Sequence, residues 1–458
     1  MDGPRSRRHR PTWIASDRPV ARLVARPLAE FLHVEAAGGI LLLAATITAL
    51  VWANSPWRDA YDQLWHTELA FRLGRYAFGE SLQHWVNDGL MAVFFFVVGL
   101  EIKRELVVGD LSEPRDAALP AIAAVGGMVV PAAIYLAFNA GGVGSHGWGI
   151  PMATDIAFAV GVLALLGDRV PAAAKLLLLA LAIVDDIGAI LVIAVFYTDE
   201  LSLGWLVAAV VGLVVVAQMW RLKVWYAPVY VVAGIVVWWC TLQSGVHATI
   251  AGVALGLVTP ARPLLRAPHA DQIAARLSAD PDVSVEDVRQ VSFELRESVS
   301  VAERVGALLH PWSSYAIVPV FALANAGIAL SWDKLGDAAG SAVTLGVVAG
   351  LVIGKPVGVM AAAWLAVRTG VGRLPEGVTW RHLQAIGMLA GIGFTVSLFV
   401  SGLAFDSGSL RDEAALGVLA ASVLAAFAAA LALLRAPTGN AGTGGAAAVT
   451  TAAPGPDG

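Results

Sequence analysis

The sequence predicts an all-α polytopic membrane protein with about twelve transmembrane helices. Hydrophobic residues make up 58% of the 458 residues, charged residues make up only 14%, and the mean hydropathy is +0.72. Apolar runs long enough to cross a hydrocarbon core of about 30 Å recur along the chain. A soluble globular domain does not have this balance, and we expect the lipid bilayer, rather than nucleic acid, to surround the protein.

Twelve apolar runs are the predicted spans, since a helix needs roughly 20 residues to cross that core. Counted from the amino terminus, they cover approximately residues 31–52, 82–100, 119–138, 147–166, 176–196, 203–220, 225–242, 245–258, 311–330, 342–367, 383–405 and 414–434. The eighth run is short and the tenth is long.

Lysine and arginine are distributed unevenly among the connections, and this distribution predicts the orientation of the spans. With the amino terminus in the cytoplasm, the inner segments hold 24 of these residues and the outer loops hold five. The remaining one, Lys355, lies inside the tenth span. The asymmetry predicts that both termini are cytoplasmic, and it supports an even number of spans.

The same pattern divides the chain into three regions. Residues 1–28 form a basic cytosolic tail, residues 29–435 form the transmembrane domain, and residues 436–458 form a low-complexity tail that we expect to be disordered. The transmembrane domain includes a long cytosolic insertion at about 260–309. The outer connection 55–81 mixes aromatic and charged residues, and the sequence does not assign its structure.

Part of the cytosolic insertion has the spacing of an amphipathic helix. Apolar residues recur there at helical intervals, at Val285, Val288, Val291, Leu295 and Val299. Such a helix is either a plain solvated element or a regulatory one, and the sequence leaves both readings open.

Four ionisable residues lie well inside predicted spans, namely Asp155, Asp185, Asp186 and Lys355. Insertion scales put a central Asp or Lys at roughly 2.5–3.5 kcal/mol each, or about 10–14 kcal/mol for the four. Ionisable groups within a membrane are presumed functional unless a partner explains them. Lys355 is either a structural partner of an aspartate or a functional group, but one lysine does not neutralise two neighbouring aspartates.

The adjacent carboxylates Asp185 and Asp186 predict a site that binds either protons or a cation. Neighbouring helical residues point about 100° apart, so the two carboxylates diverge but remain close. Low dielectric disfavours two negative charges together, and the pair should titrate as one coupled system. Oxygen ligands suit a hard cation such as Na⁺ or Li⁺. An exchanger of cations for protons requires such a site.

Two spans carry residues that favour a break in the helix. The fourth contains Pro151, Thr154 and Asp155, and the eleventh contains Gly387, Gly391 and Gly393. Interrupted spans in the two halves of a transporter indicate a binding site near the bilayer midplane. We expect Asp155 to compensate the positive ends of the broken helices and Lys355 the negative ends. Taken alone, the glycines are also compatible with close helix packing.

These residues occur in motifs that resemble those of the NhaA-type sodium/proton antiporters. The motifs, in chain order over residues 30–435, are MAVFFFVVGLEIKREL, ATDIAFAVGVLALLG, ALAIVDDIGAI, SGVHATIAG, FALANAG, IGKPVG, LPEG and GIGFTVSLF. The resemblance implies twelve helices in which spans 3–5 and 10–12 form an inverted repeat. It also implies that two discontinuous helices, 4 and 11, cross near the midplane, with Gly391 and Gly393 at the second break.

The resemblance further implies an activity and the residues that carry it. Such proteins lie in the bacterial cytoplasmic membrane and exchange cytoplasmic Na⁺ or Li⁺ for more than one external proton, for pH and sodium homeostasis. Asp186 matches the main cation and proton carboxylate, and Asp185 matches its partner, which pairs with Lys355 when the cation is absent. Thr154 and Asp155 match residues of the crossing. No cofactor is implied beyond the transported ions, and a homodimer is expected.

The pH-sensing surface of the family is matched only in part. Glu101, Lys103, Arg104 and Glu105 fit it at the inner end of the second span, and His247 is present in SGVHAT. Gly306 and Ala307 stand where the family has a Glu–His pair, just before the HPW motif at His310. The pH set point is therefore open, and His247 also suits a hydrogen-bonded structural histidine.

Two other function classes are alternatives to the antiporter, namely an intramembrane protease and a channel or another carrier. An intramembrane aspartyl protease uses two membrane aspartates, but on separate spans and with a Gly-x-Gly-Asp pattern, which this sequence lacks. A cation channel or another cation- or proton-coupled carrier needs no competition between the cation and protons. The sequence thus predicts a transporter and not an enzyme.

Overall fold

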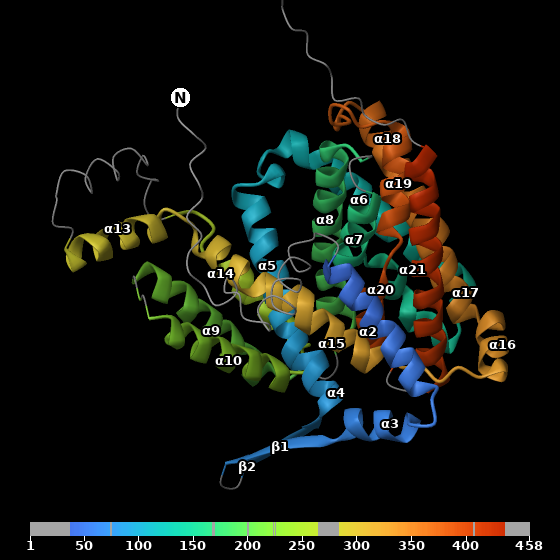
Figure 1. Ribbon diagram of the computed structural model, residues 1–458, viewed down its shortest axis with the longest axis horizontal. Coiled ribbons are helices and arrows are strands. Elements are labelled where there is room, and N and C mark those ends of the chain that lie inside the picture. Colours follow the sequence, from blue (N-terminus) through green and yellow to red (C-terminus); the bar gives the residue numbers. More distant parts are fainter. Residues whose placement is uncertain are drawn as a thin grey trace, which may run out of the picture.

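The computed structural model describes residues 37–73, 76–166, 170–198, 201–222, 224, 226–263, 284–405 and 408–435. These residues are mostly helical (Figure 1). The tails predicted at 1–28 and 436–458, and the part of the insertion from 264 to 283, lie outside the described residues.

The amino-terminal part runs from a first apolar helix through a connecting segment into two further apolar helices. Its elements are α2 (Ala37–Ala53), α3 (Arg58–His66), β1 (Glu68–Leu73), β2 (Tyr76–Ser81), α4 (Leu82–His84), the π-helical η3 (Trp85–Leu90), α5 (Met91–Val107), η4 (Asp110–Ser112) and α6 (Pro114–Asn139). The connection left unassigned at 55–81 therefore contains α3 and an antiparallel hairpin that pairs Glu68 with Ser81.

The middle part is a series of apolar helices followed by an amphipathic one. Its elements are η5 (Val143–Met152), α7 (Ile156–Leu166), α8 (Ala172–Phe196), α9 (Leu203–Arg221), α10 (Ala227–Gln243), α11 (Thr249–Val258) and α13 (Val285–Glu297). The amphipathic helix predicted from Val285 onward is confirmed as α13, and Ser284 caps its first turn.

The carboxy-terminal part contains the long interrupted helices. Its elements are α14 (Val301–Trp312), η7 (Ser313–Ile317), α15 (Val318–Asn325), α16 (Trp332–Gly340), α17 (Ala342–Ala349), η8 (Gly350–Gly354), α18 (Lys355–Arg368), α19 (Trp380–Ala390), α20 (Phe394–Ala404) and α21 (Ser409–Arg435). One helix of 25 residues runs through α14, η7 and α15. It begins ten residues before the predicted run 311–330, because Ser300 provides an amino-terminal cap there.

Among the described residues, six helices are long and apolar enough to cross a membrane, or up to nine if each bent pair is one span. The bent pairs are α2 with α3 (114°), η5 with α7 (44°) and α19 with α20 (43°). This helical, apolar architecture agrees with the predicted class of protein. The count of twelve spans stays a prediction.

The helices form two groups that meet beside the broken spans (Figure 1). In the first group, α6 packs against α18 and α8, and α21 packs against α17, α19 and α20. In the second group, α5 packs against α11 and α14, and α2 packs against α15. The pair α9 and α10 contacts α11.

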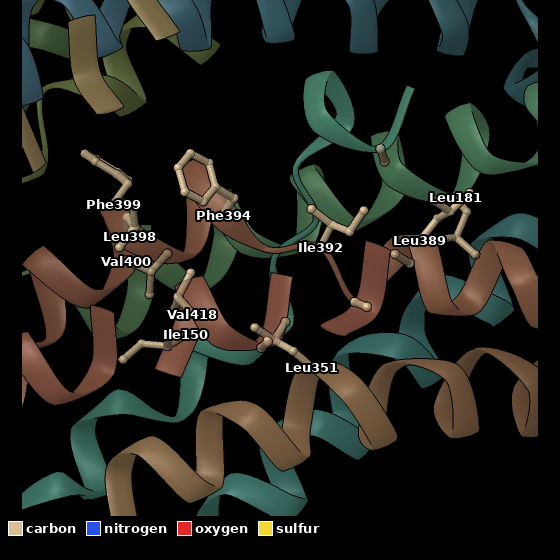
Figure 2. Close-up of a cluster of buried hydrophobic side chains, with 14 of the residues drawn as sticks. Ile150, Leu181, Leu351, Leu389, Ile392, Phe394, Leu398, Phe399, Val400 and Val418 are labelled. Carbon is tan, nitrogen blue, oxygen red and sulfur yellow. The ribbon is translucent and has the colours of Figure 1, made fainter. Parts of the chain in front are cut away.

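The hydrophobic core of the first group surrounds the breaks. Figure 2 shows Ile392 at the break between α19 and α20, with Leu351 and Leu181 on the helices around it. All three side chains are fully buried, and Val418 of α21 closes the cluster. The polar groups of the breaks are thereby excluded from both water and lipid, so they need partners within the protein.

Candidate functional site

The two breaks lie against each other at a point that we call the crossing, and their backbones are hydrogen-bonded to each other. The backbone N–H of Asp155, between η5 and α7, donates to the carbonyl oxygen of Ile392, between α19 and α20, at 2.7 Å. Ser397 Oγ of α20 donates to the carbonyl oxygen of Ile150 in η5 at 2.7 Å. The crossing therefore places the ends of four half-helices around one point.

Glycines allow this close approach. Gly391 follows the last residue of α19 and Gly393 precedes the first residue of α20. A Cβ atom at Gly391 would collide with the carbonyl oxygen of Leu351 in η8, and one at Gly393 would lie 3.2 Å from that of Ala153 at the other break. Both glycines have negative φ angles, so the requirement for glycine is one of space and not of backbone conformation.

Asp155 binds the amino-terminal ends of both α7 and α20. Its Oδ1 accepts the backbone N–H of Phe158 at 2.9 Å, and its Oδ2 accepts the backbone N–H and the hydroxyl of Thr395 at 3.0 and 2.6 Å. Helix amino termini carry a partial positive charge. A carboxylate at this position is therefore stabilised without a cationic partner.

Lys355 binds Asp185 and the carboxy-terminal end of η5. Its Nζ donates to Asp185 Oδ2 at 2.6 Å and to the carbonyl oxygen of Met152 at 2.5 Å. Both side chains of this ion pair have no exposed surface. The π-helical turn η8 ends at Gly354, so Lys355 is the first residue of α18, facing the crossing.

Thr154 links the aspartate pair to the second break. Its Oγ1 lies 2.7 Å from Asp185 Oδ2 and 2.9 Å from the carbonyl oxygen of Ala390. A hydroxyl group has one proton, so it donates to one of these two acceptors at a time. The other Asp185 oxygen, Oδ1, is buried without a hydrogen-bond partner.

Asp186 is the carboxylate without a partner. Its side chain is 5% exposed, and within the described residues no hydrogen bond or ion pair reaches it. The charges of Asp185, Asp155 and Glu101 all act on it unfavourably, and only that of Lys355 acts in the opposite sense. A buried unpaired charge is very unfavourable, so Asp186 requires a bound proton or a bound cation.

The crossing therefore holds three carboxylates against one ammonium group. Asp155 is satisfied by two helix ends and Asp185 by Lys355, which leaves Asp186 and the free oxygen of Asp185 as available ligands. Together with the Thr154 hydroxyl they form a set of oxygen donors, which suits a small hard cation. The same oxygens bind protons, so the site can exchange one for the other.

A family model described as Na⁺/H⁺ antiporter 1 matches residues 29–433. The chain belongs to this antiporter family. It is similar to the Na⁺/H⁺ antiporter NhaA 2 of Sorangium cellulosum, with 49% identity over 91% of each chain. It is also similar to NhaA 2 of Myxococcus xanthus, at 50% identity over 89% of this chain and 88% of the relative, and to NhaA of Rhodopirellula baltica, at 49% over 88% and 92%.

Membership of the Na⁺/H⁺ antiporter family confirms the resemblance drawn from the motifs. The chain is a multi-pass membrane transporter and not an enzyme. The assignment of roles to single residues of this antiporter stays a prediction, which the geometry of the crossing supports.

The antiporter's pH-sensing candidates lie in two separate places. Glu101 is half-buried in α5, close enough for its charge to act on Asp186, whereas Arg104 and Glu105 lie one turn farther along that helix. His247 lies between α10 and α11, where its Nε2 contacts the carbonyl oxygen of Tyr197. Lys103 is also on α5, and Gly306 and Ala307 are on α14.

Two parts of the antiporter site were missed by sequence reasoning. Thr395 contributes two hydrogen bonds to Asp155, and the carbonyl groups of Met152 and Ala390 accept from Lys355 and Thr154. The signal for Thr395 was a hydroxyl residue directly after the glycine break, where a helix begins. Backbone carbonyl groups leave no signal in the sequence.

Proposed function

We propose that this Na⁺/H⁺ antiporter exchanges cytoplasmic Na⁺ or Li⁺ for external protons at Asp185 and Asp186 by alternating access. The observation that carries the proposal is the inequality of the two carboxylates. Asp185 is paired with Lys355, whereas Asp186 is buried beside it with no partner among the described residues. One carboxylate thus depends on a transported ion for its neutralisation.

The proposed cycle follows from competition for these oxygens. With no cation bound, Lys355 neutralises Asp185, and Asp186 holds a proton. A cytoplasmic Na⁺ ion that enters displaces this proton and binds Asp186, the free Oδ1 of Asp185 and Thr154. Its positive charge separates Lys355 from Asp185, because two cations then share one carboxylate, and the freed Lys355 ammonium group releases a second proton to the cytoplasm. The loaded site turns outward, releases Na⁺ and takes up external protons.

The finer architecture belongs to the same proposal. Twelve spans with both termini in the cytoplasm place the breaks in spans 4 and 11 near the bilayer midplane, as discontinuous helices of an inverted repeat. Exchange of more than one proton per Na⁺ makes transport electrogenic. We also propose a homodimer in the bacterial cytoplasmic membrane, since the resemblance implies one.

Everted membrane vesicles that contain a pH-sensitive dye test the role of Asp186. We expect NaCl to release protons from vesicles with the unchanged protein and to release none with Asp186→Asn, because the amide binds neither a proton nor a cation strongly. Asp412→Asn is the matched control, since Asp412 lies on the surface in a lysine pair. Normal sodium-driven proton movement in Asp186→Asn would refute the assignment.

The same vesicles distinguish the antiporter from a channel or another carrier. A channel passes Na⁺ without opposite proton movement, so sodium uptake with no change of pH would favour it. LiCl in place of NaCl tests lithium transport. A voltage-sensitive dye tests electrogenic exchange, which predicts that a membrane potential alters the rate.

A further inference from the structure

Four polar side chains join the two helix groups at their predicted outer ends. We call Gln83, Asn87, Asn325 and Arg411 the outer clasp. Asn325 of α15 donates to Asn87 Oδ1 at 2.8 Å, and its own Oδ1 accepts from Gln83 Nε2 at 3.3 Å and Asn87 Nδ2 at 3.4 Å. Arg411 of α21 donates to the same Oδ1 at 3.3 Å. Among the residues that the structure describes, Arg411 connects this cluster to the first helix group.

The neighbours of Arg411 explain why it faces the second group. Asp412 binds Lys334 of α16 at 2.8 Å, and Glu413 accepts from Ser341 Oγ at 2.5 Å. Asp412 thus binds a residue of α16, and Glu413 binds the residue directly before α17. Arg411 is half-buried beside Gly402 of α20, and its guanidinium group donates to an amide oxygen and not to a carboxylate.

An aromatic layer lies between the outer clasp and the crossing. Along α20, Thr395 contacts Asp155, Phe399 follows one turn later, and Gly402 approaches Arg411. The seven residue steps from Thr395 to Gly402 span about 10 Å. Phe399 is 3% exposed and packs against Phe95 of α5 and Phe321 of α15, with ring centroids 5.6 and 6.2 Å apart. We call the boundary between the two helix groups the seam. It is therefore closed by two layers, the aromatic rings and the outer clasp.

We propose that the outer clasp is the outer gate of the antiporter and that Arg411 is the positioning residue that holds it shut. The inference rests on the proposed alternating access, in which the seam must open to release Na⁺. A guanidinium bound to an amide suits this task. It closes the seam, but it separates more readily than a buried ion pair, whose partners leave uncompensated charges behind.

A cysteine reporter behind the clasp tests the gate directly. Leu398 of α20 is 4% exposed and lies one turn from Gly402 toward the crossing on the same helix face, so Leu398→Cys in a Cys240→Ser background places one thiol there. A membrane-impermeant maleimide is added outside right-side-out vesicles. Loss of a hydrogen bond to a charged group changes an equilibrium by about tenfold, so we expect Arg411→Gln to speed labelling about tenfold. Apparent Na⁺ affinity from the cytoplasm should fall, because the outward-open state competes.

The matched control and a variant of opposite sign make the test decisive. Lys334→Gln removes a positive charge from the same outer end but no contact between the groups, and it should leave labelling unchanged. Asn325→Asp gives Arg411 a carboxylate, which should slow both labelling and turnover. The double variant Asn325→Asp/Arg411→Gln should lose this slowing. A loss of packing alone would not produce opposite shifts from the two single variants.

The outcomes separate this inference from the proposed function. Labelling needs neither Na⁺ nor protons, so it reports on the gate even if Asp186→Asn shows that the ion site is elsewhere. Equal labelling of Arg411→Gln and Lys334→Gln, or faster labelling of Asn325→Asp, would overturn the gate. If Arg411→Gln does not accumulate in the membrane, Asn325→Asp still decides by the direction of its shift.

Discussion

Two lysine–aspartate pairs in this protein have nearly the same length but lie in opposite environments. Lys355 Nζ is 2.6 Å from Asp185 Oδ2, and Lys334 Nζ is 2.8 Å from Asp412 Oδ2. The side chains of the first pair are 0% exposed, and those of the second are 47% and 40% exposed. Because the two distances are similar, burial and not distance sets how much each pair contributes to stability.

Burial changes the free-energy cost of losing one partner of an ion pair, and it changes the function that the pair can serve. Water screens the surface pair, so each partner tolerates the loss of the other. The side chains of the buried pair have no exposed surface, so each charge depends on its partner. A transported cation is able to act on such a pair, because its charge competes strongly in low dielectric. The buried pair therefore suits a site that responds to ions.

The largest expected effect comes from removing the buried lysine. Lys355→Ala leaves Asp185 buried without a counter-charge, which should lower stability by about 3–5 kcal/mol and abolish exchange. Thermal unfolding in detergent measures the first effect and the vesicle assay the second. The double variant Lys355→Ala/Asp185→Asn should regain most of the stability but not the exchange. If Lys355→Ala were as stable as the unchanged protein, burial would not set the energy of these ion pairs.

A smaller effect should follow from removing a neutral partner of the buried pair. Thr154→Val keeps the shape of the side chain but removes the hydroxyl that contacts Asp185 and the Ala390 carbonyl group. We expect a loss of about 1–3 kcal/mol, because a buried acceptor is left without its hydrogen bond. The apparent affinity for Na⁺ should also fall. Ser397→Ala, which removes a hydroxyl at the crossing outside the aspartate pair, should leave that affinity unchanged.

The surface pair should give a small effect. Lys334→Gln removes one partner of an exposed ion pair, so stability should change by less than about 1 kcal/mol. Added salt should reduce even this difference. Thermal unfolding at low and high ionic strength measures both. A loss as large as that of Lys355→Ala would show that exposure does not set the energy of these pairs.

The smallest effect should appear at an exposed carboxylate with no cationic partner at its helix cap. Hydrogen bonds from the Ser284 hydroxyl and backbone hold the pKa of Asp287 below its ordinary value. A lowered pKa in the folded state means that the stabilisation of α13 is present above the ordinary pKa and is lost as pH falls through the lowered one. Hydrogen exchange of α13 across acidic pH measures this loss. In Asp287→Asn the acid-dependent step should vanish.

Much of the architecture was predictable because hydropathy and helix periodicity are local properties. The ends of helices α8, α9, α10 and α21 lie within a few residues of the ends of the predicted runs. Helix α13 follows the spacing of its valines. The start of α14 at Val301 was not predicted, since its first turns carry charges that interrupt the apolar run. The hairpin β1–β2 was not predicted either, because its residues show no clear alternation.

The candidate site was predictable only as a set of residue types. An aspartate pair, a lysine and two helices prone to break were evident, because charge inside an apolar run is rare. Which aspartate pairs with Lys355 did not follow from the residues alone, and the family resemblance implied Asp185. In the structure Lys355 contacts Asp185, because η8 and α8 place these two side chains face to face.

The class of protein, the positions of most helices and the residues that are costly in a membrane all follow from the amino-acid sequence alone. These properties depend on the free energy of transfer of each side chain, which is additive along the chain. The hydrogen bond between Asp155 and Thr395, 240 residues away, is evident only in the folded structure. The same is true of the hydrogen bond from Arg411 to Asn325. Such contacts depend on how helices pack in three dimensions, and packing follows from no single segment.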